Sequence, residues 1–244
     1  MTEAQTYQLD AAQTVSRLVE KIRAADIDPA PSENIYMEDL LEPQLYGEIQ
    51  KRLPPKEAYE ILNHADARLP DGRYTRLMLD LTEATLERLE GADRVFWTEM
   101  ARVFSSDALK DAILEKFQNR IHARFGEEMP ETEAIPIFYK DFPGYFIRIH
   151  QDHPIKVATL QIYLPRDDSQ THLGTCFYRK DGDGFARLKR NAFKPNSGYA
   201  FVRTDDSWHG VDPMGPDENE RNSVAITIYV KGSQYKNTLG YQKA

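Results

Sequence analysis

The sequence predicts an α+β fold in which a mainly helical segment, residues 1–133, supports an antiparallel β-sandwich or barrel over residues 134–232. In the first part apolar residues recur at helical spacing, and the second part consists of short runs rich in β-branched and aromatic residues. Helix-like and strand-like segments do not alternate, so a parallel βαβ sheet is not expected. The length of 244 residues fits one domain, with residues 233–244 as a C-terminal tail.

Three segments of the first part carry a helical pattern. The apolar positions of one helical face are Val15, Leu18, Val19 and Ile22, then Leu45, Tyr46, Ile49 and Leu53, and then Leu109, Ile113, Phe117 and Ile121. The proline pair at 54–55 ends the second helix and is predicted to begin a further helix that continues through Leu62. Ser105 or Ser106 is expected to cap the third helix, and Gly126 to end it.

Six runs after residue 133 predict strands, because each is rich in Val, Ile, Thr, Tyr or Phe. They are residues 134–139, 145–149, 157–164, 175–179, 199–203 and 224–230. Between several of them lie combinations of Gly, Pro, Asn and Asp that form turns. We therefore expect a sheet assembly that the N-terminal helices cover.

Composition and charge exclude several classes of protein. The formal net charge is -8, and its acidic excess lies in residues 1–130, so a nucleic-acid binder is not expected. The longest apolar runs have the length of strands, which excludes a membrane span. The first residues lack the basic and apolar regions of a signal peptide, so a cytoplasmic location is predicted. Cys176 is the single cysteine and is expected to be a buried small hydrophobic residue.

Two His-x-Asp pairs are candidate metal ligands. On a strand, residues i and i+2 point to the same side, so an imidazole and a carboxylate can converge on one ion. His64 and Asp66 follow a helical pattern, and we interpret His64 as a surface or cap histidine. His150 and Asp152 instead end a predicted strand, and His209 lies near the end of another. Two histidines and one carboxylate on one face form the facial triad typical of non-haem iron oxygenases.

Arg221 is a candidate anion-binding residue. It precedes the apolar strand 224–230, where a planar guanidinium is suited to grip a carboxylate in a partly dry pocket. Ser223 lies two residues further on, on the same side of the strand, and can donate to the same carboxylate.

Seven motifs, taken in order, resemble the iron(II)- and 2-oxoglutarate-dependent dioxygenase superfamily. They are Asp-Phe-Pro-Gly at 141–144, His-x-Asp at 150–152, Thr-Leu-Gln-Ile-Tyr-Leu-Pro at 159–165, Leu-Gly-Thr-Cys-Phe at 173–177, Pro-Asn-Ser-Gly-Tyr-Ala-Phe at 195–201, Trp-His-Gly-Val at 208–211 and Arg-x-Ser at 221–223. The likeness covers about residues 134–230 and implies a double-stranded β-helix, or jelly roll, with iron at one end. Some motifs resemble the alkylated-DNA-repair branch and others the prolyl-hydroxylase-like branch, so the branch stays open.

The resemblance implies roles for particular residues. His150, Asp152 and His209 are expected to bind Fe(II), and Arg221 is expected to hold the distal carboxylate of 2-oxoglutarate with help from Ser223. The implied reaction consumes O2 and 2-oxoglutarate, releases succinate and CO2, and by default hydroxylates the substrate.

Four further residues are candidates near the co-substrate and the substrate. Tyr139 and Asp141 occupy positions where the alkylated-DNA-repair branch has an Asn-x-Tyr pair that reaches the co-substrate, and Tyr139 can hydrogen-bond a carboxylate. Asp141, Arg148 and Trp208 are candidate substrate contacts. The expected partner is a small molecule or a peptide, and Arg148 with nearby basic residues allows an anionic one.

Two other functions fit parts of the sequence. A metal-dependent hydrolase or isomerase of cupin-like fold would use the same triad for zinc or manganese, and it leaves Arg221 without a role. A non-catalytic jelly-roll binding module is the third reading, and the intact set of ligands argues against it. The identity of the substrate and the oligomeric state are not predicted.

Overall fold

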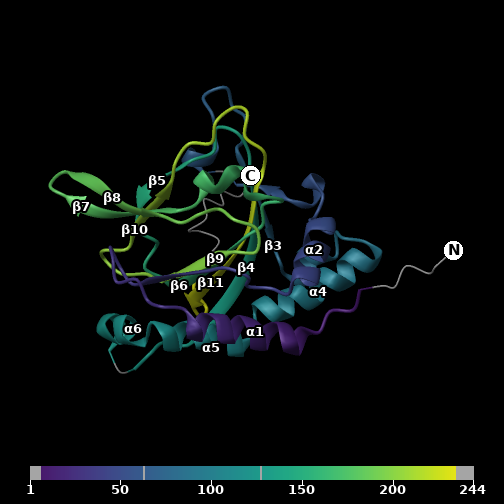
Figure 1. Cartoon of the computed structure of the whole chain (residues 1–244), viewed down its shortest axis with the longest axis horizontal. Helices are drawn as coiled ribbons and strands as arrows, with labels where there is room; N and C mark the ends of the chain where they lie inside the picture. The colour runs from purple at the N-terminus through teal and green to yellow at the C-terminus, as the bar shows by residue number, and fades with distance from the viewer. Residues whose placement is uncertain (1–6, 63, 127, 235–244) are drawn as a thin grey trace.

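The structure is a computed structural model that describes residues 7–62, 64–126 and 128–234. Two antiparallel sheets face each other, and helices cover the outer face of the larger sheet (Figure 1). The α-helices are α1 (Ala11–Ala24), α2 (Pro43–Lys51), α3 (Glu83–Leu86), α4 (Gly91–Phe104), α5 (Asp107–Lys116) and α6 (Gln118–Phe125).

The strands form a double-stranded β-helix, as predicted. The larger sheet has the order β1-β9-β6-β11-β4-β3-β2, and the smaller sheet has the order β5-β10-β7-β8. The strands are β1 (Asn34–Met37), β2 (Glu60–Ile61), β3 (Arg76–Asp80), β4 (Thr132–Asp141), β5 (Ile147–His150), β6 (Lys156–Tyr163), β7 (Cys176–Asp181), β8 (Gly184–Arg190), β9 (Gly198–Val202), β10 (Trp208–Val211) and β11 (Arg221–Val230). The six predicted runs overlap β4, β5, β6, β7, β9 and β11.

The central strand β11 shows how one sequence serves both faces of the larger sheet. Val224, Ile226 and Ile228 belong to the apolar core beneath the helices. Ala225 and Thr227 alternate with them and line a cavity between the two sheets. Because successive side chains of a strand point to opposite faces, the apolar residues pack against the helices and the residues between them form the cavity wall.

The helices pack on the apolar face of this sheet. Trp97 of α4 is fully buried and meets Phe138 of β4 edge to face, with ring centroids 4.7 Å apart. Leu109 and Ile113 of α5 are fully buried in the same core. The helical pattern in the sequence therefore marks the face that contacts the sheet.

The first part of the chain is less helical than predicted. Strands β1, β2 and β3 all come from it and extend the larger sheet at both ends. The predicted helix from Pro55 to Leu62 is wrong: Lys56–Ala58 form one 3-10 turn, and Glu60–Ile61 pair with β3. Pairing with a distant strand satisfies the backbone here, and such pairing leaves no periodic signal in so short a segment.

The predicted third helix is interrupted. It divides into α5 and α6 at Phe117, whose φ of -109° and ψ of 19° depart from helical values. The Phe117 side chain is fully buried, so the bend keeps it in the core. Ser106 caps α5 through its side chain and Gly126 ends α6, as predicted. Among the described residues, none of the helices has the length and apolar character needed to cross a bilayer.

Candidate metal and anion-binding site

The two sheets bring His150, Asp152 and His209 together. His150 ends β5, Asp152 follows in the loop to β6, and His209 lies on β10 directly opposite His150 in the antiparallel register. One ligand atom of each side chain lies within 4.8 Å of the others, and the imidazole centroids are 4.4 Å apart. Cross-strand neighbours on one face have this spacing, which explains why residues 59 positions apart meet.

Backbone carbonyl groups orient both imidazoles. Nδ1 of His150 lies 2.9 Å from the carbonyl oxygen of Arg148, and Nδ1 of His209 lies 2.9 Å from that of Ser207. A carbonyl only accepts, so each Nδ1 carries the proton and donates. Each Nε2 is then left with its lone pair available to a metal, which is the usual arrangement of metal-binding histidines.

Asp152 is buried and held in its ionised form. Burial acts to raise its pKa, but Lys156, His209 and His150 together outweigh this and hold the pKa of the carboxyl well below its usual range. Nζ of Lys156 donates to Oδ1 of Asp152 over 2.6 Å. An ionised carboxylate beside two imidazole nitrogens is the donor set that a divalent iron ion prefers.

The loop that carries Asp152 is fixed by two arginines. Nε of Arg203, just after β9, donates to the backbone carbonyl of Asp152 over 3.2 Å. Arg124 of α6 donates to the carbonyl of Lys156 over 2.7 Å and also to that of Pro154. The helical part of the chain thus positions the loop that carries Asp152 as well as covering the sheet.

His209 is expected to remain neutral far below the pH at which an exposed histidine gains a proton. Burial lowers its pKa to about 4, and the neighbouring His150 adds to this effect. In the metal-free protein, NMR titration of the His209 imidazole should give a midpoint near 4. Because the unfolded chain binds this proton near pH 6.5, the stability contribution is present above 6.5 and is lost as pH falls towards 4. A midpoint near 6.5 would contradict the burial seen here.

A cavity runs between the sheets from the cluster of His150, Asp152 and His209 to two buried arginines. Its lining includes this cluster and the residues Arg76, Tyr139, Lys156, Thr159, Gln161, Thr175, Tyr199, Phe201 and Arg221. Thr159 Oγ1 is buried and has no hydrogen-bond partner within the described part of the chain. The cavity is therefore polar along one wall and cationic at the end remote from the histidines.

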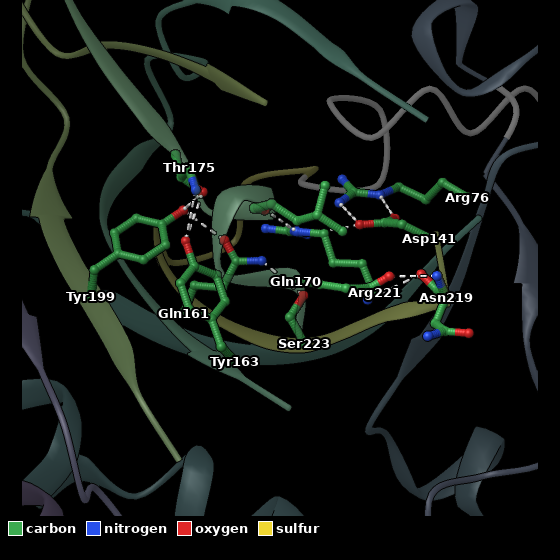
Figure 2. Close-up of polar contacts among 11 residues, drawn as sticks. Arg76, Asp141, Gln161, Tyr163, Gln170, Thr175, Tyr199, Asn219, Arg221 and Ser223 are labelled. Carbon is green, nitrogen blue, oxygen red and sulfur yellow. Dashed lines mark hydrogen bonds and ion pairs between the residues drawn. The ribbon is translucent and has the colours of Figure 1, made fainter. Parts of the chain in front are cut away.

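Arg221 lies at that remote end and is fully buried. Its Nη1 pairs with Oδ2 of Asp141 over 2.7 Å, and its Nε donates to the carbonyl of Leu173 over 2.8 Å (Figure 2). Its Nη2 has no hydrogen-bond partner among the described residues. A buried guanidinium nitrogen left unpaired is costly, and an incoming anion would satisfy it.

Arg76 is a second buried arginine that the sequence did not lead us to name. Its Nε and Nη2 pair with the two oxygens of Asp141 at 2.6 and 3.0 Å (Figure 2). Its guanidinium lies 4.2 Å from the ring centroids of both Tyr139 and Tyr145. The sequence does contain the feature by which Arg221 was recognised, because Arg76 also begins an apolar strand. Two guanidinium groups share one carboxylate, which leaves one positive charge.

The structure therefore gives Asp141 a different place from the one expected. It was a candidate substrate contact, but its side chain is fully buried between Arg76 and Arg221. Asp141 pairs across the sheet with both arginines, since its backbone neighbours are Arg76 on β3 and Arg221 on β11. The three charges meet because they share one register position on three adjacent strands.

Ser223 belongs to a chain of buried hydrogen bonds beside Arg221. Gln161 donates to Ser223 Oγ over 2.8 Å and accepts from the Tyr199 hydroxyl over 2.6 Å. Thr175 connects Tyr199 with Tyr163 in the same network (Figure 2). Ser223 thus faces the same side as Arg221, as the two-residue spacing predicts, and it also orients the Gln161 amide.

The remaining candidates lie at different distances from the cavity. Tyr139 lines it, and burial raises the pKa of its hydroxyl, which therefore stays protonated and able to donate. Arg148 lies at the rim, where its Nε pairs with Asp66 over 2.6 Å. Trp208, the third candidate substrate contact, does not line the cavity and packs against Phe185, with ring centroids 4.9 Å apart. Strand alternation explains this, because its neighbour His209 points inward.

The second His-x-Asp pair has the role predicted for it. His64 is exposed and caps a 3-10 turn, where its side chain accepts from the backbone N–H of Asp66. Asp66 forms an ion pair with Arg148 and does not belong to a cluster of candidate metal ligands among the described residues. Strand context, and not the motif itself, therefore distinguished the two pairs.

No protein-family model and no curated protein matches this sequence. Solved structures do match. A Pseudomonas putida prolyl-4-hydroxylase has 17% identity and a TM-score of 0.50, with 89% of this chain and 100% of that chain covered. A Trichoplax adhaerens prolyl hydroxylase, in complex with a hypoxia-inducible-factor peptide fragment, has 12% identity and a TM-score of 0.50, covering 97% and 99%. The non-heme alpha-ketoglutarate-dependent epimerase SnoN of nogalamycin biosynthesis has 11% identity and a TM-score of 0.54, covering 96% and 91%. At these identities the likeness concerns the fold: this chain has the double-stranded β-helix of the 2-oxoglutarate- and iron(II)-dependent oxygenases.

Proposed function

We propose that the protein is an Fe(II)- and 2-oxoglutarate-dependent oxygenase that hydroxylates a small-molecule or peptide substrate and releases succinate and CO2. One observation carries the proposal. A single cavity joins the cluster of His150, Asp152 and His209 to the buried Arg221, whose Nη2 has no partner within the described chain. A diacid that binds a metal at one end and an arginine at the other fits such a cavity.

The donor set fits a ferrous ion. The Nε2 atoms of His150 and His209 and the carboxylate of Asp152 would hold the ion from one side. When bound, the iron and 2-oxoglutarate supply the oxidising chemistry, and the protein supplies binding, orientation and a shaped cavity. The Arg148 and Ser207 carbonyls fix the imidazoles, while Lys156 and Arg203 fix the carboxylate side chain and its backbone.

The remote end fits the distal carboxylate of 2-oxoglutarate. Arg76 and Arg221 carry two positive charges against the one negative charge of Asp141. One additional carboxylate makes this group neutral and gives Arg221 Nη2 an acceptor. Asp141 and the Leu173 carbonyl hold the Arg221 guanidinium in place. The side chain therefore loses little conformational entropy when the diacid binds.

Replacing Arg221 with Met should weaken 2-oxoglutarate binding and leave the metal in place. Loss of a buried charge-assisted contact costs about 2 kcal/mol or more, which is roughly 30-fold in affinity. Calorimetric titration of 2-oxoglutarate into the anaerobic Fe(II) protein measures this effect. Arg179→Met, at an exposed position on β7, is the matched control. Unchanged 2-oxoglutarate affinity in Arg221→Met would remove the reason for assigning that residue.

The function itself is tested by succinate release. Purified protein supplied with Fe(II), ascorbate, O2, 2-oxoglutarate and the correct substrate is expected to release succinate in proportion to the substrate consumed. Omission of 2-oxoglutarate should stop all turnover. A reaction that proceeds with zinc or manganese and without 2-oxoglutarate would instead favour the metal-dependent hydrolase or isomerase.

A further inference from the structure

A second cavity, of about 580 Å³, opens on the metal ligands from the side of β5. It shares Arg76, Tyr139, Ile147, His150, Asp152 and Lys156 with the inner cavity. Its other walls come from Leu62, His64, Asp66 and Ala67, from Tyr145 and the rest of β5, and from the loop that follows His150. Because the inner cavity suits the co-substrate, this outer cavity is the place for the substrate, an assignment that rests on the proposed function.

The cationic side chains of the outer cavity differ in how they are neutralised. Arg148 forms an ion pair with Asp66, and Arg76 forms one with Asp141. Lys156 lies at the start of β6, and its Nζ donates to Oδ1 of Asp152. Asp66 and Asp141 do not belong to the cluster of His150, Asp152 and His209, whereas the partner of Lys156 is itself a proposed metal ligand.

Charge balance in the loaded site therefore singles out Lys156. Asp152 and one carboxylate of bound 2-oxoglutarate would offset the two charges of a ferrous ion. The distal carboxylate, together with Asp141, offsets Arg76 and Arg221. Asp66 offsets Arg148. The positive charge left on the described walls of the two cavities is then that of Lys156.

The position of Lys156 suits the recognition of an anion. Its side chain is 17% exposed, it lines both cavities, and its ammonium group has three donors, of which Asp152 takes one. We propose that Lys156 binds an oxyanion of the substrate, a carboxylate, phosphate or sulfate group, beside the metal. The bond that is oxidised would then lie close to that anionic group, which narrows the substrate to small acids or acidic conjugates.

The test uses protein loaded with Co(II), which does not turn over, and proceeds in two calorimetric steps. The first step measures the binding of 2-oxoglutarate to the Co(II) protein. The second step titrates sulfate or acetate into the complex saturated with 2-oxoglutarate, and the tighter of the two identifies a tetrahedral or a planar oxyanion. Wild type is compared with Lys156→Met, with Lys156→Arg and with Arg148→Met, the other cation of the same cavity.

We expect at least about tenfold weaker anion binding in Lys156→Met, near wild-type binding in Lys156→Arg, and no change in Arg148→Met. Saturating metal removes any effect of the substitution on Co(II) affinity from the comparison. The inference is overturned if neither anion binds to wild type, or if Lys156→Met binds the anion as wild type does. Loss of anion binding only in Arg148→Met would assign the site to Arg148. Absence of 2-oxoglutarate binding in the first step would refute the proposed function, and the charge balance with it.

Discussion

Replacing Asp152 with Ala should abolish metal binding at micromolar Fe(II), with a loss in affinity of about 100-fold or more. Changing residues that merely orient a ligand typically costs 10–100-fold, and Asp152 supplies the only carboxylate of the cluster found among the described residues. The substitution also removes the negative charge that offsets the ion, and it leaves Lys156 facing the metal unpaired. Anaerobic titration with Fe(II), or competition with a chelating dye, measures the affinity.

The control for Asp152→Ala is Asp183→Ala, an exposed position in the turn between β7 and β8. This variant should bind Fe(II) as wild type does. Circular dichroism distinguishes loss of the ligand from loss of the fold. A folded Asp152→Ala variant that keeps wild-type affinity would show that the ion is held elsewhere, and the proposed metal site would have to be abandoned.

Replacing Asp141 with Asn should cause the largest loss of stability of the substitutions considered, about 3–5 kcal/mol. Asp141 is fully buried and is the shared counter-ion of Arg76 and Arg221. Asparagine keeps the shape but removes the charge, so two buried guanidinium groups are left facing each other without compensation. Urea denaturation followed by circular dichroism gives the free energy of unfolding.

Asp205→Asn is a suitable comparison, because Asp205 also pairs with an arginine but its side chain is 92% exposed. Exposed ion pairs contribute little, so its change in unfolding free energy should stay below about 1 kcal/mol. An equally small change in Asp141→Asn would mean that the two arginines do not depend on this carboxylate. The charge argument for a dicarboxylate ligand would then fail as well.

Of the strands β4 to β11, the sequence predicted all but β8 and β10, and it predicted that His150, Asp152 and His209 belong to one site. Local composition was sufficient for the predicted strands, because residues rich in Val, Ile, Tyr and Phe between turn residues have few other conformations available. His150 and Asp152 were readable as a pair because strand geometry places residues i and i+2 on one side. The strand context of this pair also separated it from His64 and Asp66.

Only the tertiary structure decided which distant residues meet those local elements. The short strands β1, β2 and β3 form because they pair with the edges of the larger sheet. No sequence pattern within these strands indicates which distant strand they pair with. Arg76 joins Arg221 through Asp141 because β3, β4 and β11 align at one register position. Trp208 faces away from the cavity because its strand neighbour His209 faces into it. Secondary structure can be predicted from neighbouring residues, whereas the anion site and the surroundings of Lys156 depend on contacts between segments far apart in the chain.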